Sequence, residues 1–428
     1  MLPRRLLPLL VLTGAAFALS LLLSSSSAAA QPTVIATVPA GDEPYGVGVN
    51  PATNRIYVAN TVSNNVSVID GASNTVVATV PVGNAPLGVA ADPFTNRIYV
   101  SNSWDDDVSV IDGASNTVVA TIPVGHEPRD IAANPTTNRI YVANRWSDSV
   151  SVIDGASNTV VATVPVGYWP WGVAVNPSTN RIYVANESSD NVSVIDGATN
   201  TVVATVPVGH VPYSVAVNPA TNRIYVANGG SYDVSVIDGT TNTVVATVHT
   251  GHASWGVAVN ATTNRIYLAN GLSENASVID GTTNTVLATV PVGEWAGGVA
   301  ANPTTNRIYV ANWASDTVSV IEDLPVTPTA TSTPAPPGTT EDIPLQGGIC
   351  NPVATTYPDG TPVATIAAAV SPSGMLESLW EFEEGIWLGY SPDFPEASDL
   401  TEMDRLDAMF VCIGGSGPGA ATFTRPLV

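Results

Sequence analysis

Short apolar runs alternate with polar turns through most of this chain, and the pattern recurs at a constant interval of 42 residues. The clearest marker is NRIYVAN at residues 54–60, which returns six more times with only conservative changes. One full unit, residues 46–83, reads GVGVNPATNRIYVANTVSNNVSVIDGASNTVVATVPVG. Its four apolar runs are short, rich in β-branched residues and separated by Gly, Pro, Asn and Asp, which predicts four β-strands per unit.

A four-stranded unit of this length is typical of one propeller blade, so seven units predict an all-β, seven-bladed β-propeller. The first run, GVGV, is built of small residues in every copy, so we place it innermost, where strands crowd around the axis. RIYVAN and VSVID carry apolar residues on both faces, as strands between neighbouring blades require. The last run, TVVATVPV, reaches a proline in most copies, which suits an exposed outer edge.

The two ends of the repeat region complement each other. Residues 33–41, TVIATVPAG, form an outer-strand run that no inner run precedes, and residues 317–323, TVSVIED, form a third run that no outer run follows. Pairing them completes the seventh blade and closes the ring, which removes the open ends of a solenoid. We therefore assign residues 33–323 to the propeller, closed by its N-terminal outer strand.

Repeats that carry IYVAN, VSVID and TVVATVPVG resemble the YVTN-type β-propeller family. The resemblance covers residues 33–323, about two thirds of the chain. It implies a scaffold that is found in exported bacterial proteins and in archaeal surface-layer proteins. Because one scaffold carries many functions, the resemblance implies the fold and leaves the activity open.

Each unit also repeats an arginine at the start of its second strand and an acid at the end of its third. If these strands form a hairpin, the two side chains face each other, and we expect a structural ion pair in every blade. Alternatively, the carboxylate only caps the DGASN turn that follows it. The expected pairs are Arg55–Asp70, Arg97–Asp112, Arg139–Asp154, Arg181–Asp196, Arg223–Asp238, Arg265–Asp280 and Arg307–Glu322.

The first 30 residues predict a signal peptide. Arg4 and Arg5 precede an apolar run, and Ala28-Ala29-Ala30 supplies a cleavage signal before Gln31. We therefore expect export from a bacterial cell, to the medium or the cell surface. A retained membrane anchor is the alternative.

The segment after the propeller changes composition twice. Residues 324–342 are rich in Pro and Thr and predict an extended linker. Residues 343–428 predict a small module, α+β or mostly β, in which LESLWEFEEGIWLGY forms two strands and MFVCIGG and FTRPLV form others. Cys350 and Cys412, the two cysteines of the chain, are expected to pair there as a disulfide.

The charge pattern limits the possible partners. The chain has 13 basic residues, all of them arginine, against 36 acidic ones, a formal net charge of −23. Nucleic-acid binding needs a basic face, so we exclude a nucleic-acid partner. An acidic surface suits a soluble exported protein, or one that meets cations. No segment after the signal is long and apolar enough for a bilayer, so we expect no stable membrane span once it is removed.

Variation between units is concentrated in two loops, the one before the first strand and the one between the second and third strands. In an up-and-down blade both loops lie on the same face of the ring. Their aromatic residues suit a recognition surface and can stack on sugar rings, unless they merely cover the blade tops. The candidate ligand-binding residues are Tyr45, Arg129, Trp169, Trp171, Tyr213, Trp255 and Trp295 from the first loop and Trp104, Trp146, Tyr232 and Trp313 from the second.

One position of the first loop points to the central funnel, because it comes directly before the innermost strand. A ligand on the axis would touch the residues that occupy it. They are Tyr45, Leu87, Arg129, Trp171, Tyr213, Trp255 and Gly297.

Motifs for catalysis or cofactor binding are not evident. The chain has no P-loop, no haem-attachment motif and no nucleophile elbow, so we assign no catalytic residue, metal ligand or cofactor. His126, His210 and His252 hold equivalent positions in three units, which the blade rotation separates, so we interpret them as solvent-facing residues. Lactonases and a streptogramin lyase are among seven-bladed relatives, but their motifs do not map onto this chain.

The sequence therefore predicts a secreted or cell-surface binding protein that recognises an extracellular ligand through the varied face. The ligand could be a glycan, a peptide or an envelope component. A hydrolase or lyase that acts in the central funnel is one alternative, and binding is favoured over catalysis. An architectural surface-layer component is another.

Overall fold

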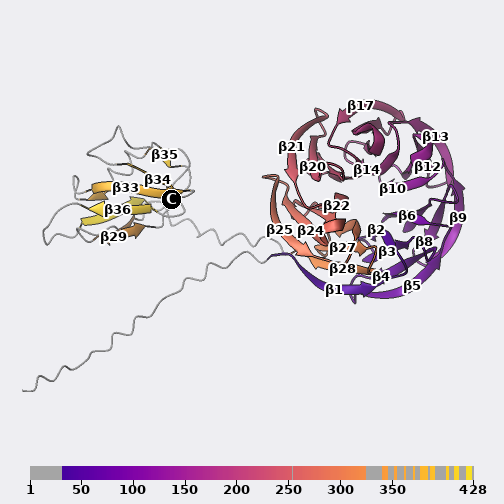
Figure 1. Ribbon diagram of the computed structural model, residues 1–428, viewed down its shortest axis with the longest axis horizontal. Helices are drawn as coiled ribbons and strands as arrows, with labels where there is room; N and C mark the ends of the chain where they lie inside the picture. The colour runs from indigo at the N-terminus through magenta and orange to yellow at the C-terminus, as the bar shows by residue number, and fades with distance from the viewer. Residues whose placement is uncertain are drawn as a thin grey trace, which may run out of the picture. The chain divides into compact units, whose positions relative to one another are not determined.

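The computed structural model describes residues 31–252 and 254–323, together with the backbone of strands β29–β37. The chain divides into two compact units, Met1–Val326 and Thr327–Val428. The first contains seven four-stranded antiparallel sheets arranged around an axis (Figure 1). The predicted seven-bladed, all-β propeller is confirmed.

Blades 1 to 6 each use four consecutive strands, ordered from the axis outward. Blade 1 is β2 (Pro44–Asn50), β3 (Arg55–Asn60), β4 (Asn65–Asp70) and β5 (Thr75–Pro81); blade 2 is β6 (Pro86–Asp92), β7 (Arg97–Asn102), β8 (Asp107–Asp112) and β9 (Thr117–Pro123); blade 3 is β10 (Pro128–Asn134), β11 (Arg139–Asn144), β12 (Ser149–Asp154) and β13 (Thr159–Pro165). Blade 4 is β14 (Pro170–Asn176), β15 (Arg181–Asn186), β16 (Asn191–Asp196) and β17 (Thr201–Pro207); blade 5 is β18 (Pro212–Asn218), β19 (Arg223–Asn228), β20 (Asp233–Asp238) and β21 (Thr243–His249); blade 6 is β22 (Ser254–Asn260), β23 (Arg265–Asn270), β24 (Asn275–Asp280) and β25 (Thr285–Pro291). Single 3₁₀ turns, η1 (Arg145–Ser147), η2 (Glu187–Ser189) and η3 (Gly271–Ser273), follow the second strands of blades 3, 4 and 6.

Blade 7 is assembled from both ends of the repeat region. Its inner strands are β26 (Ala296–Asn302), β27 (Arg307–Asn312) and β28 (Thr317–Glu322), and its outer strand is β1 (Thr33–Pro39). β1 runs antiparallel to β28, with Val38 opposite Val318. The predicted closure by the N-terminal strand is confirmed, and we call the junction between blades 7 and 1 the seam.

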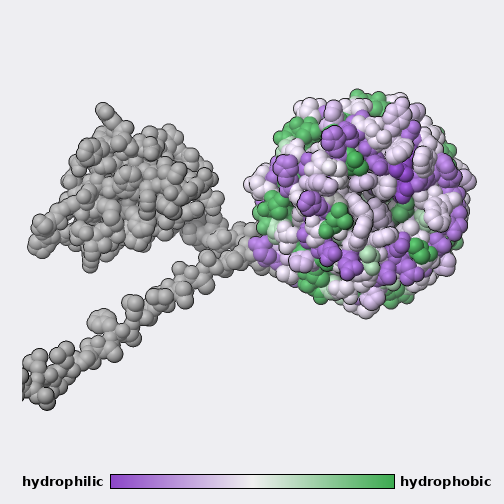
Figure 2. Space-filling view, viewed as in Figure 1, coloured by the Kyte–Doolittle hydropathy of each residue, from purple (hydrophilic) through white to green (hydrophobic). Residues whose placement is uncertain are grey.

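Small residues line the axis because neighbouring inner strands nearly touch. A Cβ atom on Gly46 would lie 1.9 Å from the carbonyl oxygen of Leu87 in the next blade. Further out, the second and third strands bury large apolar side chains between blades; Tyr57 and Val68 of blade 1 pack with Val89 and Ile98 of blade 2. Figure 2 shows hydrophilic residues with dispersed hydrophobic ones on the viewed face of the propeller.

The second asparagine of NRIYVAN fastens each blade internally. Asn60 is fully buried, and its side-chain amide donates to Asn65 Oδ1 at 2.7 Å and to Ser67 Oγ at 2.9 Å. Its own Oδ1 accepts from the Gly41 amide at 3.1 Å. This one side chain therefore joins the second strand, the third strand and the incoming loop, and the equivalent asparagines of the other six blades are also buried.

The first asparagine of NRIYVAN joins one blade to the next. It adopts a positive φ, 52° at Asn54, and its Oδ1 accepts from the asparagine that ends the innermost strand of the preceding blade. Six such bonds run around the ring, with donor and acceptor 2.7–3.1 Å apart: Asn50–Asn96, Asn134–Asn180, Asn176–Asn222, Asn218–Asn264, Asn260–Asn306 and Asn302–Asn54. The last of them closes the seam.

The expected ion pairs form in blades 1 to 5. The carboxylates also cap the following turn, so the ion pair and the cap occur together and the alternative of a cap alone is wrong for these blades. In blade 1, Asp70 Oδ2 pairs with Arg55 while Oδ1 accepts from the backbone amides of Ala72 and Ser73 at 2.8 and 2.9 Å. The backbone hydrogen bond from Ser73 is the main cause that holds the pKa of Asp70 below its usual value. The other four pairs, 2.6–2.8 Å long, are Arg97–Asp112, Arg139–Asp154, Arg181–Asp196 and Arg223–Asp238.

The last two blades depart from this expectation because the chain leaves the ring there. Asp323 stands where blade 1 has Gly71, and its fully buried carboxylate pairs with Arg265 of blade 6 at 2.7 Å and accepts from Asn260 at 2.7 Å. The ion pair of Arg265 is therefore with Asp323 and not with Asp280. Arg307 lies opposite Glu322 in the ladder, yet its guanidinium donates across the seam to the carbonyl oxygen of Gly71.

The described part of the second unit consists of strands. They are β29 (Thr340–Leu345), β30 (Asn351–Val353), β31 (Thr361–Pro362), β32 (Val370–Ser371), β33 (Leu376–Glu383), β34 (Ile386–Tyr390), β35 (Glu402–Met403), β36 (Met409–Ile413) and β37 (Ala421–Pro426). The predicted hairpin is β33–β34, and the last two predicted strands are β36 and β37. β29 begins at Thr340, inside the segment assigned to the linker, because it pairs with β37.

Three predictions concern residues beyond the described ones. Residues 1–30, most of the linker and the side chains of Cys350 and Cys412 lie outside them, so the signal peptide and the disulfide stay predictions. Within the described ranges, no helix combines the length and the hydropathy that a bilayer crossing needs.

Blade 2 supplies a test of the asparagine links, because Asp92 replaces the donor asparagine. Asp92 is buried, and Asn138 Oδ1, the expected acceptor, has no hydrogen-bond partner. We expect Asp92→Asn to add the missing bond and to stabilise the propeller by about 1 kcal/mol. Denaturant unfolding checks this, with Asn134→Asp as the reverse variant that should destabilise. A lower stability for Asp92→Asn contradicts the role given to these links.

Candidate binding site at the propeller axis

The inner strands bring one repeat position together around the axis. Two adjoining spaces lie there, an outer one of about 230 Å³ and an inner one of about 200 Å³. Thr61 and Trp313, from loops after the second strands, complete the outer space. The predicted funnel residues line these spaces: Tyr45, Leu87, Arg129, Trp171, Tyr213 and Trp255 line both, and Gly297 lines the inner one.

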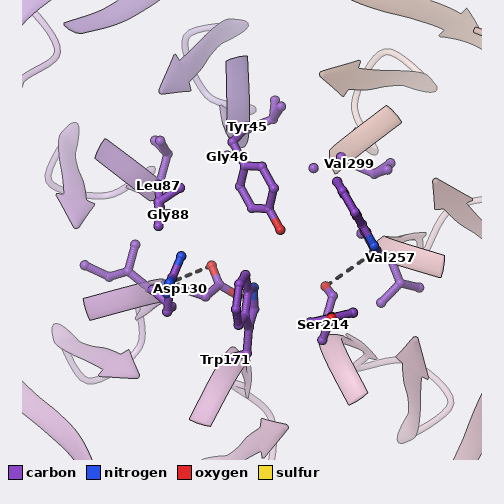
Figure 3. Close-up of a pocket in the computed structure, with 18 of the residues that line it drawn as sticks. Tyr45, Gly46, Leu87, Gly88, Asp130, Trp171, Ser214, Val257 and Val299 are labelled. Atoms are coloured by element: carbon purple, nitrogen blue, oxygen red, sulfur yellow. Dashed lines mark hydrogen bonds between the residues drawn. The ribbon is translucent and has the colours of Figure 1, made fainter. Parts of the chain in front are cut away.

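Tyr45 and Trp171 face each other across the axis. Figure 3 shows the Tyr45 hydroxyl pointing to the centre of the ring, with the Trp171 indole opposite. Desolvation by the surrounding protein raises the pKa of Tyr45 to about 12, although the nearby Arg129 charge acts against the shift. The hydroxyl therefore keeps its proton at neutral pH and can donate a hydrogen bond into the funnel.

A first series of aromatic contacts, here called the seam row, approaches the axis from blades 6 and 7. Trp313 and Trp295 have ring centroids 5.7 Å apart, and Trp295 and Trp255 are 5.6 Å apart. Trp255 in turn lies 6.5 Å from Tyr45. These separations are those of mutually stabilising aromatic pairs, so the row is a single packed array.

A second series, here called the arginine row, approaches from blades 3 to 5. The Trp146 and Trp169 rings are 5.4 Å apart, and the Arg145 guanidinium lies 4.4 Å from the Trp169 ring and 5.4 Å from the Trp171 ring. Trp171 then contacts Tyr213 edge to face at 5.1 Å. Arg145 thus bridges the outer and axial aromatic residues by cation–π contacts.

The predicted site residue Arg129 and its neighbour Arg145 are both neutralised by the protein itself. Arg129 pairs with Glu127, and Arg145 lies 3.5 Å from Glu127 and 3.1 Å from Glu187. These four side chains are only 14–17% exposed. The guanidinium of Arg129 also lies 4.3 Å from the Trp171 ring. The cluster presents no net charge to a ligand, and Arg129 Nε is left buried without a hydrogen-bond partner.

Two polar residues at the axis, Asp130 and Ser214, were not among the predicted site residues. Asp130 and Ser214 occupy a position that is glycine in the other five blades, and that departure was the signal that could have revealed them. Asp130 accepts from the amides of Ile131 at 2.8 Å and Val173 at 3.1 Å, while Ser214 accepts from the Val257 amide at 3.3 Å (Figure 3). Each side chain therefore ties its blade to the next one at the axis. The glycines are Gly46, Gly88, Gly172, Gly256 and Gly298.

Part of the loop between the second and third strands has a structural role, because its side chains accept hydrogen bonds from the backbone of the loop before the first strand. In blade 1, Ser63 Oγ accepts from the Asp42 amide at 2.8 Å and Asn64 Oδ1 accepts from the Ala85 amide at 2.9 Å. Equivalent bonds recur, for example from Trp169 to Asp148 at 2.9 Å. The free variation of this loop is thus concentrated in its first two residues.

The remaining candidates lie away from the axial spaces. Trp104 is 81% exposed on its loop, and Tyr232 packs edge to face on His252 at 4.9 Å. His126 and His210 each bond to a separate aspartate, Asp106 and Asp190. Within the described ranges, no group of three or more His, Cys, Asp or Glu side chains is arranged to hold a metal ion.

The propeller is similar to a solved structure, that of Kuenenia stuttgartiensis hydrazine synthase. The two share 21% sequence identity with a TM-score of 0.60, over 66% of this chain and 96% of that chain. At this identity the likeness shows the β-propeller fold alone. No family model matches the chain, and no curated protein matches it.

The pKa of Asp130 provides a test of its placement. Burial raises this pKa from 3.8 to about 6. Between these values the folded chain holds a proton that the unfolded chain has lost, so stability falls as the pH rises from about 4 to about 6. Asp130→Asn does not titrate, so its stability relative to the parent should rise across that interval.

Urea unfolding at several pH values measures this difference. Ser214→Ala is the matched control, because it changes the other polar axial residue without changing a titrating group. Its stability should stay parallel to that of the parent. A difference between parent and Asp130→Asn that is independent of pH contradicts a partly buried carboxyl with a raised pKa at the axis.

Proposed function

We propose that this chain is an exported binding protein that holds an extracellular ligand over the mouth of the propeller axis. The observation that carries the proposal is the convergence of one repeat position on one cavity. This position, directly before the innermost strand, carries a large side chain in six of the seven blades. In four of them the residue is Tyr or Trp. A concave aromatic site with a few polar groups is the usual form of a ligand site.

Binding fits the polar groups at the axis better than catalysis does. Asp130 is the acid that lines the funnel, and both of its oxygens already accept backbone amides. Those contacts suit a carboxyl that joins blades, since one of them comes from the amide of the neighbouring blade. Export is supported by the sequence of residues 1–30 and by the resemblance to YVTN-type propellers.

The test is retention of a ligand by variants of the axial aromatic residues. Arrays of glycans, peptides and envelope fragments identify what the full chain retains. Trp171→Ala and Trp255→Ala should each weaken that interaction by about 2 kcal/mol or more, roughly 30-fold in Kd, because both indoles line the cavity.

Phe94→Ala is the control on the opposite face, where an aromatic ring is 78% exposed. It should leave retention unchanged. Retention that survives both tryptophan substitutions, or that is lost in the Phe94 variant, contradicts a site at the axial mouth.

A further inference from the structure

The seam row and the arginine row end on opposite sides of the same cavity. The seam row finishes at Tyr45 of blade 1 and the arginine row reaches the axis at Trp171 of blade 4, and these two residues face each other in Figure 3. Aromatic surface therefore continues across the mouth, from blade 7 over the axis to blade 3. The outer members are accessible, since Trp146 is 54% and Trp295 is 40% exposed.

This continuous aromatic surface, made of the seam row and the arginine row, is here called the track. The axial cavity holds only part of it. Its outer and inner spaces measure about 230 and 200 Å³, so together they match a site for one small molecule and not for an extended chain. Trp146, Trp169 and Trp295 lie outside its lining, yet they are packed into the same rows as the residues that line it. A ligand that used the whole surface would be long and would insert only one of its units at the axis.

The charges along the track favour an uncharged ligand. Glu127 and Glu187 are engaged with Arg129 and Arg145, and Asp130 is engaged with backbone amides. A strongly charged ligand would compete with ion pairs that are already made and mostly buried. The Tyr45 hydroxyl, which points to the centre of the ring, is a neutral donor that suits hydroxyl or ring oxygens.

We propose that the ligand is a linear neutral polysaccharide that lies across both aromatic rows, with one sugar ring seated over the axial cavity. This inference rests on the proposed function and specifies its ligand class. A pyranose ring has apolar C–H faces that stack on indole and phenol rings, and an equatorial rim of hydroxyls that takes hydrogen bonds. Consecutive rings of a linear glycan repeat these faces, and because neighbouring aromatic rings of a row are tilted by 49–59° to one another, each can contact a different sugar ring.

Calorimetric titration of the full chain with purified oligosaccharides tests the proposal. The probes are neutral series of cello-, chito-, xylo- and malto-oligosaccharides of one to six sugars, with oligomers of a uronic acid as the charged comparison. For at least one neutral series, the affinity should rise tenfold or more between two and six sugars. Uronic-acid hexamers should bind at least tenfold more weakly than the neutral hexamer.

Variants of row members that lie outside the cavity lining test whether that gain comes from the aromatic rows. Trp146→Ala and Trp295→Ala should each weaken hexamer binding about tenfold and disaccharide binding much less, because their indoles lie outside the cavity. Phe94→Ala removes an exposed aromatic ring on the opposite face that belongs to neither row, and it should leave both affinities unchanged.

The inference fails if no neutral series binds, if affinity does not depend on length, or if the uronic-acid oligomers bind best. A retained peptide whose binding needs Trp171 would overturn the glycan assignment and leave the axial site intact. A retained glycan that is indifferent to Trp171 and Trp255 would instead overturn the proposed function.

Discussion

Closure of the ring is the constraint on which the rest of this structure depends. A ring of blades closes only if each blade meets the next in the same way, so the side chains at the interfaces must repeat. The asparagine-to-asparagine bonds, the buried Asn60 series and the packed Tyr, Val and Ile layers are those repeated interfaces. At the seam the same bonds recur between Asn302 and Asn54, and β1 supplies the strand that blade 7 lacks.

The difference between residues at blade interfaces and residues at the axis explains where the sequence varies from blade to blade. A change at a residue that lies between blades, or that joins a loop to a strand, breaks a repeated hydrogen bond, as Asp92 does in blade 2. Residues that face the axis or cap the varied face have no equivalent neighbour to satisfy, so each blade can carry a different one. The site is built from those positions, and the ring places them side by side although they are far apart in sequence.

The sequence predicted the propeller, its closure and the funnel residues, because a period and a pattern of small, apolar and polar residues encode them directly. It could not predict Asp323 as the partner of Arg265, since that contact joins the exit of the ring to another blade. The pattern predicted Arg129 as a ligand-binding residue, whereas the fold pairs its guanidinium with Glu127. Asp130 was not predicted because the innermost strand that carries it is otherwise made of small and apolar residues.

The central claim is that the repeated residues carry the fold while the axial ones are free for a ligand. Thermal unfolding of two triple variants tests it most directly: Asn60, Asn186 and Asn270 replaced by Ala, and Tyr45, Trp171 and Trp255 replaced by Ala. Each lost asparagine leaves buried groups unpaired, at about 1–3 kcal/mol apiece. The account predicts that the asparagine variant melts far below the parent and that the axial variant stays much closer to it. An axial variant that melts as low as the asparagine variant would show that these aromatic residues are structural plugs, and would contradict the account.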